Sequence, residues 1–163
     1  MNADAIRVGT GFDVHPLCEG RPCVIGGVVM DHPRGLAGHS DADVLLHAII
    51  DALLGASGLG DIGTLFPDSD AAYKDISSLT LLEKVYSGLK ERGVAIINID
   101  SVVICEEPKI APSAGLMKRK ISAALGGLDP KRIGIKGKTA EKLGFTGRKE
   151  GIAAQAVCLV RLG

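Results

Sequence analysis

Hydrophobic and polar residues along the chain follow patterns typical of strands in five segments. Residues 6–14 alternate as a half-buried strand does, and residues 24–30 place Gly26-Gly27 between two short apolar stretches, as in a hairpin or bulge. Residues 94–105 form a β-branched run that predicts a mostly buried strand. Residues 133–139 and 151–161 are further strand candidates.

Three other segments have the apolar spacing of helices. Residues 40–54 begin with Ser40 and Asp43, a pair resembling a capping box. Residues 78–92 carry one apolar face and stop before Gly93, and residues 113–125 start after Pro112 and stop at Gly126-Gly127. The glycine-rich residues 55–60, the acidic residues 61–70 and residues 141–148 are expected to be loops.

This order of elements predicts an α+β fold with mixed α/β layers. We expect one mostly β sheet with three helices packed on one face. With 163 residues, 46% of them hydrophobic, the chain is long enough for one domain with its own core, spanning residues 1–163.

The charge balance limits the partners that we expect, and the cysteines indicate the cellular compartment. Nineteen basic residues balance nineteen acidic ones, so we expect no nucleic-acid partner and no attraction to an anionic membrane. The cysteines at 18, 23, 105 and 158 form no Cys-x-x-Cys pair, which favours free thiols in a reducing compartment. Residues 1–7 lack the apolar run of a secretory signal. We expect a cytoplasmic protein, or a plastid one if a transit peptide has been removed.

Asp13, His15 and His47 are candidate metal ligands. Side chains two residues apart in a strand share a face, so Asp13 and His15 point the same way, and His47 would join them from the first helix. One oxygen and two nitrogen ligands with a fourth position open are typical of catalytic zinc. Gly9 and Gly11 in the same strand would allow a ligand to approach the backbone closely. The alternatives are a surface acid, a surface histidine and a buried core histidine.

Two features near His47 suggest further roles. Asp43 and Asp51 lie one helical turn to either side of it and could orient its ring through the second nitrogen. His39 and Ser40 precede the helix, where unpaired N–H groups favour phosphate oxygens, although Ser40 could simply be the N-cap.

Two later segments also carry polar groups suited to a ligand. Residues 106–109 (EEPK) follow a buried strand, and residues 138–141 (KTAE) combine a hydroxyl and a carboxylate beside a cation, as phosphate and magnesium sites do. Ordinary charged turns would look the same. The sequence contains no Walker loop and no Gly-x-Ser-x-Gly elbow.

Seven blocks taken together resemble one known family, 2-C-methyl-D-erythritol 2,4-cyclodiphosphate synthase of the non-mevalonate isoprenoid pathway. The blocks are residues 9–15 (GTGFDVH), 39–44 (HSDADV), 47–48 (HA), 51–55 (DALLG), 60–63 (GDIG), 66–68 (FPD) and 141–148 (EKLGFTGR). The resemblance implies a lyase that acts on 4-diphosphocytidyl-2-C-methyl-D-erythritol 2-phosphate. The 2-phosphate attacks the β-phosphorus, CMP leaves, and a cyclic diphosphate forms.

The same resemblance assigns roles to individual residues. It implies zinc at Asp13, His15 and His47, magnesium or manganese at Glu141, and stabilisation of the reacting phosphorus by His39 and Thr139. It also implies a homotrimer whose active sites lie between subunits, with Phe145 and Arg148 on the substrate side or at the trimer axis. The residues expected to bind substrate are Asp13, Val14, His15, His39, Ser40, Asp61, Ile62, Gly63, Phe66, Pro67, Asp68, Ser69, Asp70, Cys105, Glu106, Glu107, Pro108, Lys109, Ile110, Ala111, Lys138, Thr139, Ala140, Glu141, Phe145 and Arg148.

Some positions depart from the family pattern, and two other functions fit the metal ligands. Lys138 and Ala140 replace polar uncharged residues, and residues 105–107 (CEE) replace a more neutral stretch. A metal-dependent phosphoesterase could use the same three ligands to activate water. A non-catalytic module that binds a nucleotide or an isoprenoid diphosphate around a structural metal would need a fourth protein ligand. No cysteine lies nearby at a suitable spacing, which leaves only the distant Cys18 and Cys23 for that role.

Overall fold

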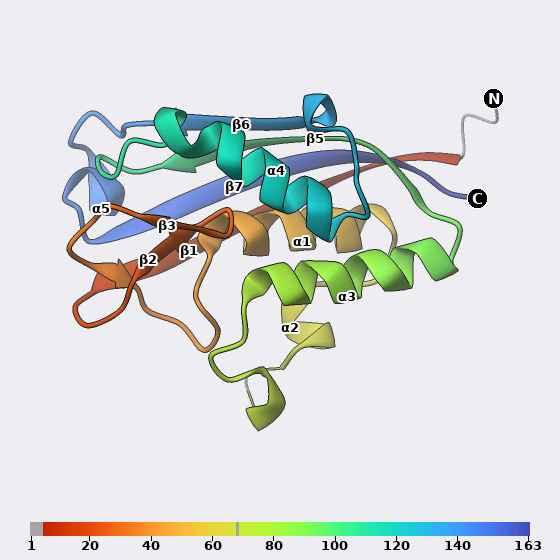
Figure 1. The fold of residues 1–163 in the computed structure, drawn as a ribbon, viewed down its shortest axis with the longest axis horizontal. Coiled ribbons are helices and arrows are strands. Elements are labelled where there is room, and N and C mark those ends of the chain that lie inside the picture. Colours follow the sequence, from red (N-terminus) through yellow and green to blue (C-terminus); the bar gives the residue numbers. More distant parts are fainter. Residues whose placement is uncertain (1–4, 68) are drawn as a thin grey trace.

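The computed structural model describes residues 5–67 and 69–163, and a five-stranded sheet forms its centre (Figure 1). Only β5 and β6 pair in parallel; the other neighbours in this sheet are antiparallel. Across the sheet the strands are β4 (Gly35–Leu36), β1 (Ile6–Cys18), β7 (Gly151–Arg161), β5 (Ala95–Ile104) and β6 (Ile133–Lys138).

The predicted strands are present, with two differences. The first strand continues past residue 14 to Cys18, so Asp13 and His15 lie within it. The hairpin at Gly26-Gly27 also exists, but β2 (Cys23–Ile25) and β3 (Val28–Met30) form a separate two-stranded sheet, so the prediction of one sheet was wrong there. Gly26 and Gly27 have φ angles of 60° and 72°, a left-handed turn that glycine adopts readily.

Three long helices cover one face of the central sheet, as predicted (Figure 1). Helix α1 (Val44–Ala56) packs on β1 and β7, α4 (Ala114–Ala124) packs on β6, and α3 (Ser78–Glu91) packs against both helices. Several expected loops and linking segments contain short helical turns. These are α2 (Ile62–Leu65), η2 (Ala71–Tyr73), η3 (Ala111–Ser113), η4 (Pro130–Arg132) and α5 (Gly144–Gly147).

Gly9 and Gly11 bring helix α1 unusually close to β1. A Cβ atom on Gly9 would lie 2.0 Å from the Ala52 carbonyl oxygen, and one on Gly11 would lie 2.0 Å from the Ala48 carbonyl oxygen. The close approach expected at these glycines is therefore made by a helix and not by a ligand. It places the face of β1 that carries Asp13 directly against the helix that carries His47.

Asp43, and not Ser40, caps helix α1, which begins at Val44. The fully buried Asp43 carboxylate accepts hydrogen bonds from the backbone N–H groups of Leu46 (3.1 Å), Gly26 (2.9 Å) and Gly27 (2.6 Å). Burial raises the pKa of Asp43 to about 6, although the three N–H donors favour the charged form. The prediction that Ser40 opens the helix in a capping box was wrong. The hydrogen bonds from Gly26 and Gly27 hold Asp43 at the N-cap, and they join the start of α1 to the β2–β3 hairpin.

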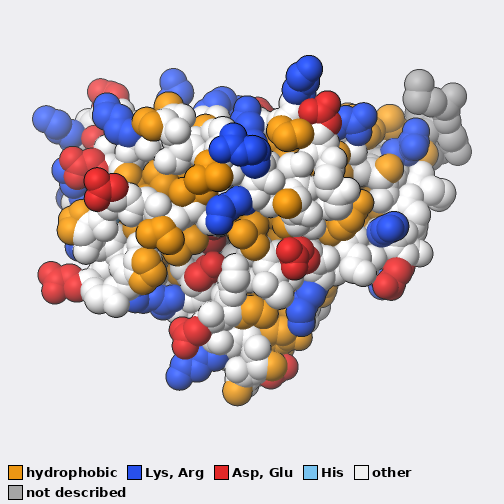
Figure 2. All heavy atoms as spheres, viewed as in Figure 1, with side chains coloured by type: hydrophobic (Ala, Val, Ile, Leu, Met, Phe, Trp, Pro, Cys, Tyr) orange, Lys and Arg blue, Asp and Glu red, His pale blue; other side chains and the backbone are white. Residues whose placement is uncertain are grey.

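The sheet face opposite α1 carries a patch of exposed apolar side chains in the described part of the chain, beside polar ones such as Thr10, Gln155 and Asp100. Val8, Phe12, Val14 and Val157 lie on this face with 68%, 59%, 42% and 42% of their surface exposed. Elsewhere, acidic and basic side chains are interspersed over the face shown in Figure 2. In the part of the chain that the structure describes, no helix has the length and apolar character needed to span a membrane.

Candidate metal centre and substrate cavities

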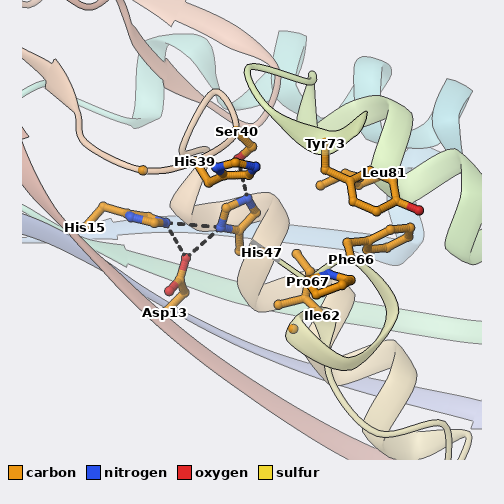
Figure 3. A pocket seen from close by; sticks show the side chains of 12 residues that line it. Asp13, His15, His39, Ser40, His47, Ile62, Phe66, Pro67, Tyr73 and Leu81 are labelled. Carbon is orange, nitrogen blue, oxygen red and sulfur yellow. Dashed lines mark hydrogen bonds and ion pairs between the residues drawn. The ribbon is translucent and has the colours of Figure 1, made fainter. Parts of the chain in front are cut away.

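Asp13, His15 and His47 converge on one point (Figure 3). Asp13 Oδ2 lies 2.9 Å from His15 Nε2 and 3.0 Å from His47 Nδ1, and the two ring nitrogens are 3.1 Å apart. Strand alternation places Asp13 and His15 on the same face of β1, and the close approach of α1 brings His47 to them. The sequence prediction that these three side chains meet is confirmed.

The three donor atoms fit a zinc ion. Ligands held about 2.1 Å from a tetrahedral zinc lie about 3.4 Å apart, so this triangle would open by only a few tenths of an ångström. Among the described residues, these three are the one group of His, Cys, Asp and Glu side chains whose donor atoms lie within 4.8 Å of one another. Neither Cys18 nor Cys23 belongs to it, so no described cysteine closes the site as a structural metal would require.

The charges at the site also suit a cation. Burial by itself raises the pKa of Asp13, but hydrogen bonds and charge from His15 and His47 outweigh it and lower the pKa to about 2. Burial disfavours the charged form of His47, yet Asp13, with Asp43 and Asp41 further away, raises the pKa of His47 above its ordinary value. Asp13 therefore stays ionised at neutral pH, and this negative charge attracts either protons or a metal ion to the rings.

Two serines and Asp41 orient the His47 ring. His47 Nε2 lies 3.1 Å from Ser40 Oγ and 3.0 Å from Ser78 Oγ, and the Ser78 hydroxyl donates to Asp41. Because Ser78 gives its proton to Asp41, its oxygen accepts from a proton on Nε2, which leaves a lone pair on Nδ1 at the metal position. The predicted orienting role of Asp43 and Asp51 was wrong, since Asp43 caps α1 and Asp51 accepts from the Ile62 N–H at 2.8 Å.

Ser78 and Asp41 were missed because they lie 31 and 6 residues from His47 in sequence. Ser78 looks like an ordinary serine at a helix start, and Asp41 looks like one more acid near a cap. Only the packing of α3 against α1 brings the Ser78 hydroxyl to the His47 ring.

A cavity of about 470 Å³ opens beside the three candidate ligands (Figure 3). His39 Nε2 in its wall is buried and has no hydrogen-bond partner among the described residues, so it is available to a ligand. Phe66 and Tyr73 form an edge-to-face pair on the other wall with ring centroids 5.2 Å apart. The lining consists of Asp13, His15, Gly38, His39, Ser40, His47, Ile62, Gly63, Phe66, Pro67, Tyr73 and Leu81.

Several predicted substrate residues do not line this cavity. Val14 points to the opposite face of β1, and Asp61 is the N-cap of α2, where its carboxylate accepts from the Thr64 N–H at 2.8 Å. Asp70 similarly caps η2 through the Ala72 N–H, and Ser69 is exposed beside it. Asp68 lies outside the described residues. Tyr73 and Leu81 line the cavity instead. Neither was predicted, because their apolar character is the only signal in the sequence that could have indicated them.

A second cavity, of about 190 Å³, lies where β5 and β6 end. It is lined by Cys105, Glu106, Pro108, Lys109, Ile110, Ala111, Gly137, Lys138 and Thr139. Most of the predicted substrate residues from 105–111 and 138–141 therefore gather here. Glu107 instead forms an ion pair with Lys149 at 3.0 Å, and it borders a neighbouring hollow.

The remaining predicted residues lie just beyond this cavity. Glu141 follows it in the turn after β6, where the Thr139 hydroxyl donates to its carboxylate. Ala140 lies in the same turn. Arg148 pairs with Glu150, with Nε and Oε1 2.8 Å apart, and Phe145 is 39% exposed on α5. Neither Phe145 nor Arg148 lines either cavity of the described chain.

Comparisons with known proteins agree with this geometry. A family model described as the YgbB family matches residues 6–161. The chain is 56% identical over 154 residues to 2-C-methyl-D-erythritol 2,4-cyclodiphosphate synthase of Aromatoleum aromaticum, a match that covers 94% of this chain and 93% of that one.

Solved structures of proteins from the same family also match the chain. The bifunctional IspDF from Campylobacter jejuni matches with a TM-score of 0.92 at 44% identity, over 97% of this chain and 42% of that longer chain. A CDP complex of IspF from Plasmodium falciparum matches with a TM-score of 0.85 at 34% identity, over 99% of each chain. The chain therefore belongs to the YgbB family, that of the 2-C-methyl-D-erythritol 2,4-cyclodiphosphate synthases.

Proposed function

We propose that the chain converts 4-diphosphocytidyl-2-C-methyl-D-erythritol 2-phosphate to 2-C-methyl-D-erythritol 2,4-cyclodiphosphate and CMP. The observation that carries the proposal is the convergence of Asp13, His15 and His47 at the wall of a cavity with a free buried imidazole nitrogen on His39. Family membership supplies the substrate, and this geometry supplies a place to hold its phosphates.

The residues of the first cavity bind and align the phosphates. Asp13, His15 and His47 would hold zinc, which supplies positive charge and a coordination position for a phosphate oxygen. His39 Nε2, buried and unpartnered among the described residues, would donate a hydrogen bond to a phosphate oxygen when it carries the proton. No protein base is needed, because the attacking group is an ionised phosphate that the substrate's own tether holds near the β-phosphorus.

The residues of the second cavity would hold the cytidine diphosphate end. Backbone groups of residues 105–111 that are not already hydrogen-bonded would contact the base, and Lys109 and Lys138 bring positive charge to the lining of the same cavity. Glu141 would hold a magnesium or manganese ion together with the diphosphate, and the Thr139 hydroxyl lies beside it. Phe145 and Arg148 would lie on the substrate side or at the trimer axis.

Self-association as a homotrimer completes the proposal. The residues that line the first cavity and those that line the second are different sets, although one substrate must contact both. Sites built between subunits would bring the two sets together. The exposed Val8, Phe12, Val14 and Val157 give this face of the sheet an apolar patch suited to such an interface. Phe12→Glu is expected to lower the mass measured by light scattering, and an unchanged mass would exclude this face as the interface.

The cysteines fit a cytoplasmic location. All four are free thiols, and Cys23, Cys105 and Cys158 are buried, where burial raises the pKa of each to about 11 and keeps it protonated and unreactive. A reducing compartment keeps thiols in this state.

Substitution of His47 tests the assignment directly. His47→Ala is expected to abolish CMP release and zinc retention while circular dichroism stays that of the parent protein. His32→Ala, which removes a histidine outside both cavities, serves as the matched control. Near-normal CMP release by zinc-free His47→Ala would overturn the mechanism. Phosphorus NMR of the product separates cyclisation from phosphoesterase activity, because hydrolysis yields a linear phosphate.

A further inference from the structure

Glu106 reaches from the end of β5 into the turn that follows β6. One carboxylate oxygen of Glu106, Oε1, accepts hydrogen bonds from the backbone N–H groups of Ala140 (3.0 Å) and Lys142 (3.3 Å). These two N–H groups lie on either side of Glu141 in the chain. A single oxygen atom therefore holds both flanks of the residue assigned to the second cation.

The turn that Glu106 holds has an unusual backbone. Glu141 and Lys142 have φ angles of 52° and 64°, in the left-handed region that residues with a Cβ rarely occupy. Two consecutive residues in this conformation persist only where the surroundings fix them. The Glu106 carboxylate, lying in the concavity formed by the two N–H groups, is such a fixing contact.

The conformation of this turn decides where the Glu141 carboxylate points. The Thr139 hydroxyl donates to Glu141 Oε1 from one side, and β6 is tied to β5 just before the turn by the Cys105 N–H, which donates to the Lys138 carbonyl at 3.0 Å. Without the Glu106 oxygen, the turn would keep its anchor at β6 and the bond from the Leu143 N–H to the Ala140 carbonyl (2.9 Å), but it would lose the contacts that tie both flanks of Glu141 to the end of β5.

We propose that Glu106 is a positioning residue that holds Glu141 and Thr139 in the conformation that binds the divalent cation on the cytidine side. This inference rests on the proposed function, which places that cation at Glu141. On this proposal the acceptor oxygen matters more than the negative charge, because both contacts are to neutral backbone N–H groups, which an uncharged amide oxygen can also accept from.

A pair of variants of nearly equal size tests the requirement for an oxygen. Glu106→Gln keeps an acceptor oxygen, whereas Glu106→Met keeps the length of the side chain without one. Glu106→Ala serves as a second variant without an acceptor, and Glu83→Gln, at an exposed acid on α3, controls for loss of charge. The readouts are amide hydrogen exchange at Ala140 and Lys142, Mn²⁺ binding in the presence of CDP, and the Mn²⁺ concentration that half-saturates CMP release.

We expect the variants without an acceptor oxygen to lose amide protection and Mn²⁺ binding, and the variant that keeps one to behave like the parent protein. Glu106→Met and Glu106→Ala are expected to lose about five- to tenfold in protection of the two amides. They are also expected to weaken Mn²⁺ binding about tenfold or more, as loss of an outer partner of a metal ligand does. Glu106→Gln is expected to stay within about twofold of the parent protein in all three readouts, as is Glu83→Gln.

Two results would overturn the inference. One is unchanged amide protection and unchanged Mn²⁺ binding in both variants without an acceptor. The other is loss of Mn²⁺ binding in Glu106→Gln equal to that in Glu106→Met, which would make charge and not the acceptor the cause. Glu141→Gln separates the two proposals: if it leaves Mn²⁺ binding unchanged, the proposed cation site is wrong, and if it alone weakens binding, only the role of Glu106 is wrong.

Discussion

Replacing Gly11 with alanine is expected to destabilise the fold and to weaken zinc binding through the same displacement. The added Cβ would lie 2.0 Å from the Ala48 carbonyl oxygen and 2.8 Å from the Ala52 nitrogen, whereas real Cβ contacts essentially never fall below 3.0 Å. Both neighbouring atoms are backbone, so no side chain can rotate away. Helix α1 must move away from β1 by about 1 Å, and such overpacking typically costs about 1–3 kcal/mol of folding free energy.

The same movement would pull the candidate ligands apart. Asp13 lies two residues beyond Gly11 on the same strand face, and His47 immediately precedes Ala48 on the helix. Their donor atoms are 3.0 Å apart, and an added displacement of about 1 Å brings them near the limit for two atoms that each lie about 2.1 Å from one ion. Zinc affinity is therefore expected to fall at least about tenfold.

Urea unfolding of the zinc-free protein and competition with a chelator measure the two effects separately. Gly55→Ala is the matched control, because a Cβ on Gly55 meets nothing within 4 Å and alanine within a helix stabilises by up to about 1 kcal/mol. The two glycine substitutions are thus expected to have opposite signs in unfolding. A Gly11→Ala protein that is destabilised but binds zinc normally would show that the spacing between α1 and β1 does not set the metal site.

Three further predictions follow from contacts of α1. Ser78→Ala removes one of the two hydroxyls beside His47 Nε2, so zinc affinity is expected to fall about tenfold in chelator competition, and no change would refute the role of Ser78 in orienting the ring. Asp43→Ala leaves two buried N–H groups and the half-buried one of Gly27 without their acceptor, so urea unfolding is expected to show a loss of about 2–4 kcal/mol. A loss below about 1 kcal/mol would contradict the role of Asp43 in joining α1 to the β2–β3 hairpin. Acidification is expected to release zinc as the pH falls through the pKa of His47, which Asp13 raises, with affinity falling about tenfold per pH unit for each ring that takes up a proton. Asp13, with a pKa of about 2, stays charged throughout. A zinc affinity that does not change as the pH is lowered from about 7 to about 5 would therefore count against His47 as a ligand.

Patterns local to one element predicted the fold well. The last strand was expected at residues 151–161 and is found there, because its apolar run is long and bounded by turn residues. The shared face of Asp13 and His15 followed from strand geometry alone. The prediction that His47 meets them came from its residue type and the family resemblance, since nothing in the local pattern fixes how a helix docks on a strand.

Features that depend on contacts between distant segments could not be predicted from such local patterns. Ser40 and Asp43 are both good N-cap residues, and which of them caps the helix depends on the N–H groups of Gly26 and Gly27, which are 17 and 16 residues away from Asp43. The pairing of Ser78 with His47 depends in the same way on the packing of α3 against α1. The separate β2–β3 sheet likewise follows from its attachment to the start of α1.

The place of β7 between β1 and β5 has a consequence for biosynthesis. In chain order β7 follows every other strand, yet it supplies the neighbour through which β1 joins β5. Until β7 has been synthesised, β1, which carries Asp13 and His15, can therefore pair within this sheet only with the two-residue strand β4. Nascent chains stalled before residue 151 are expected to lack a stable metal centre and to depend on chaperones, whereas chains released after residue 161 can close the sheet in a single late step.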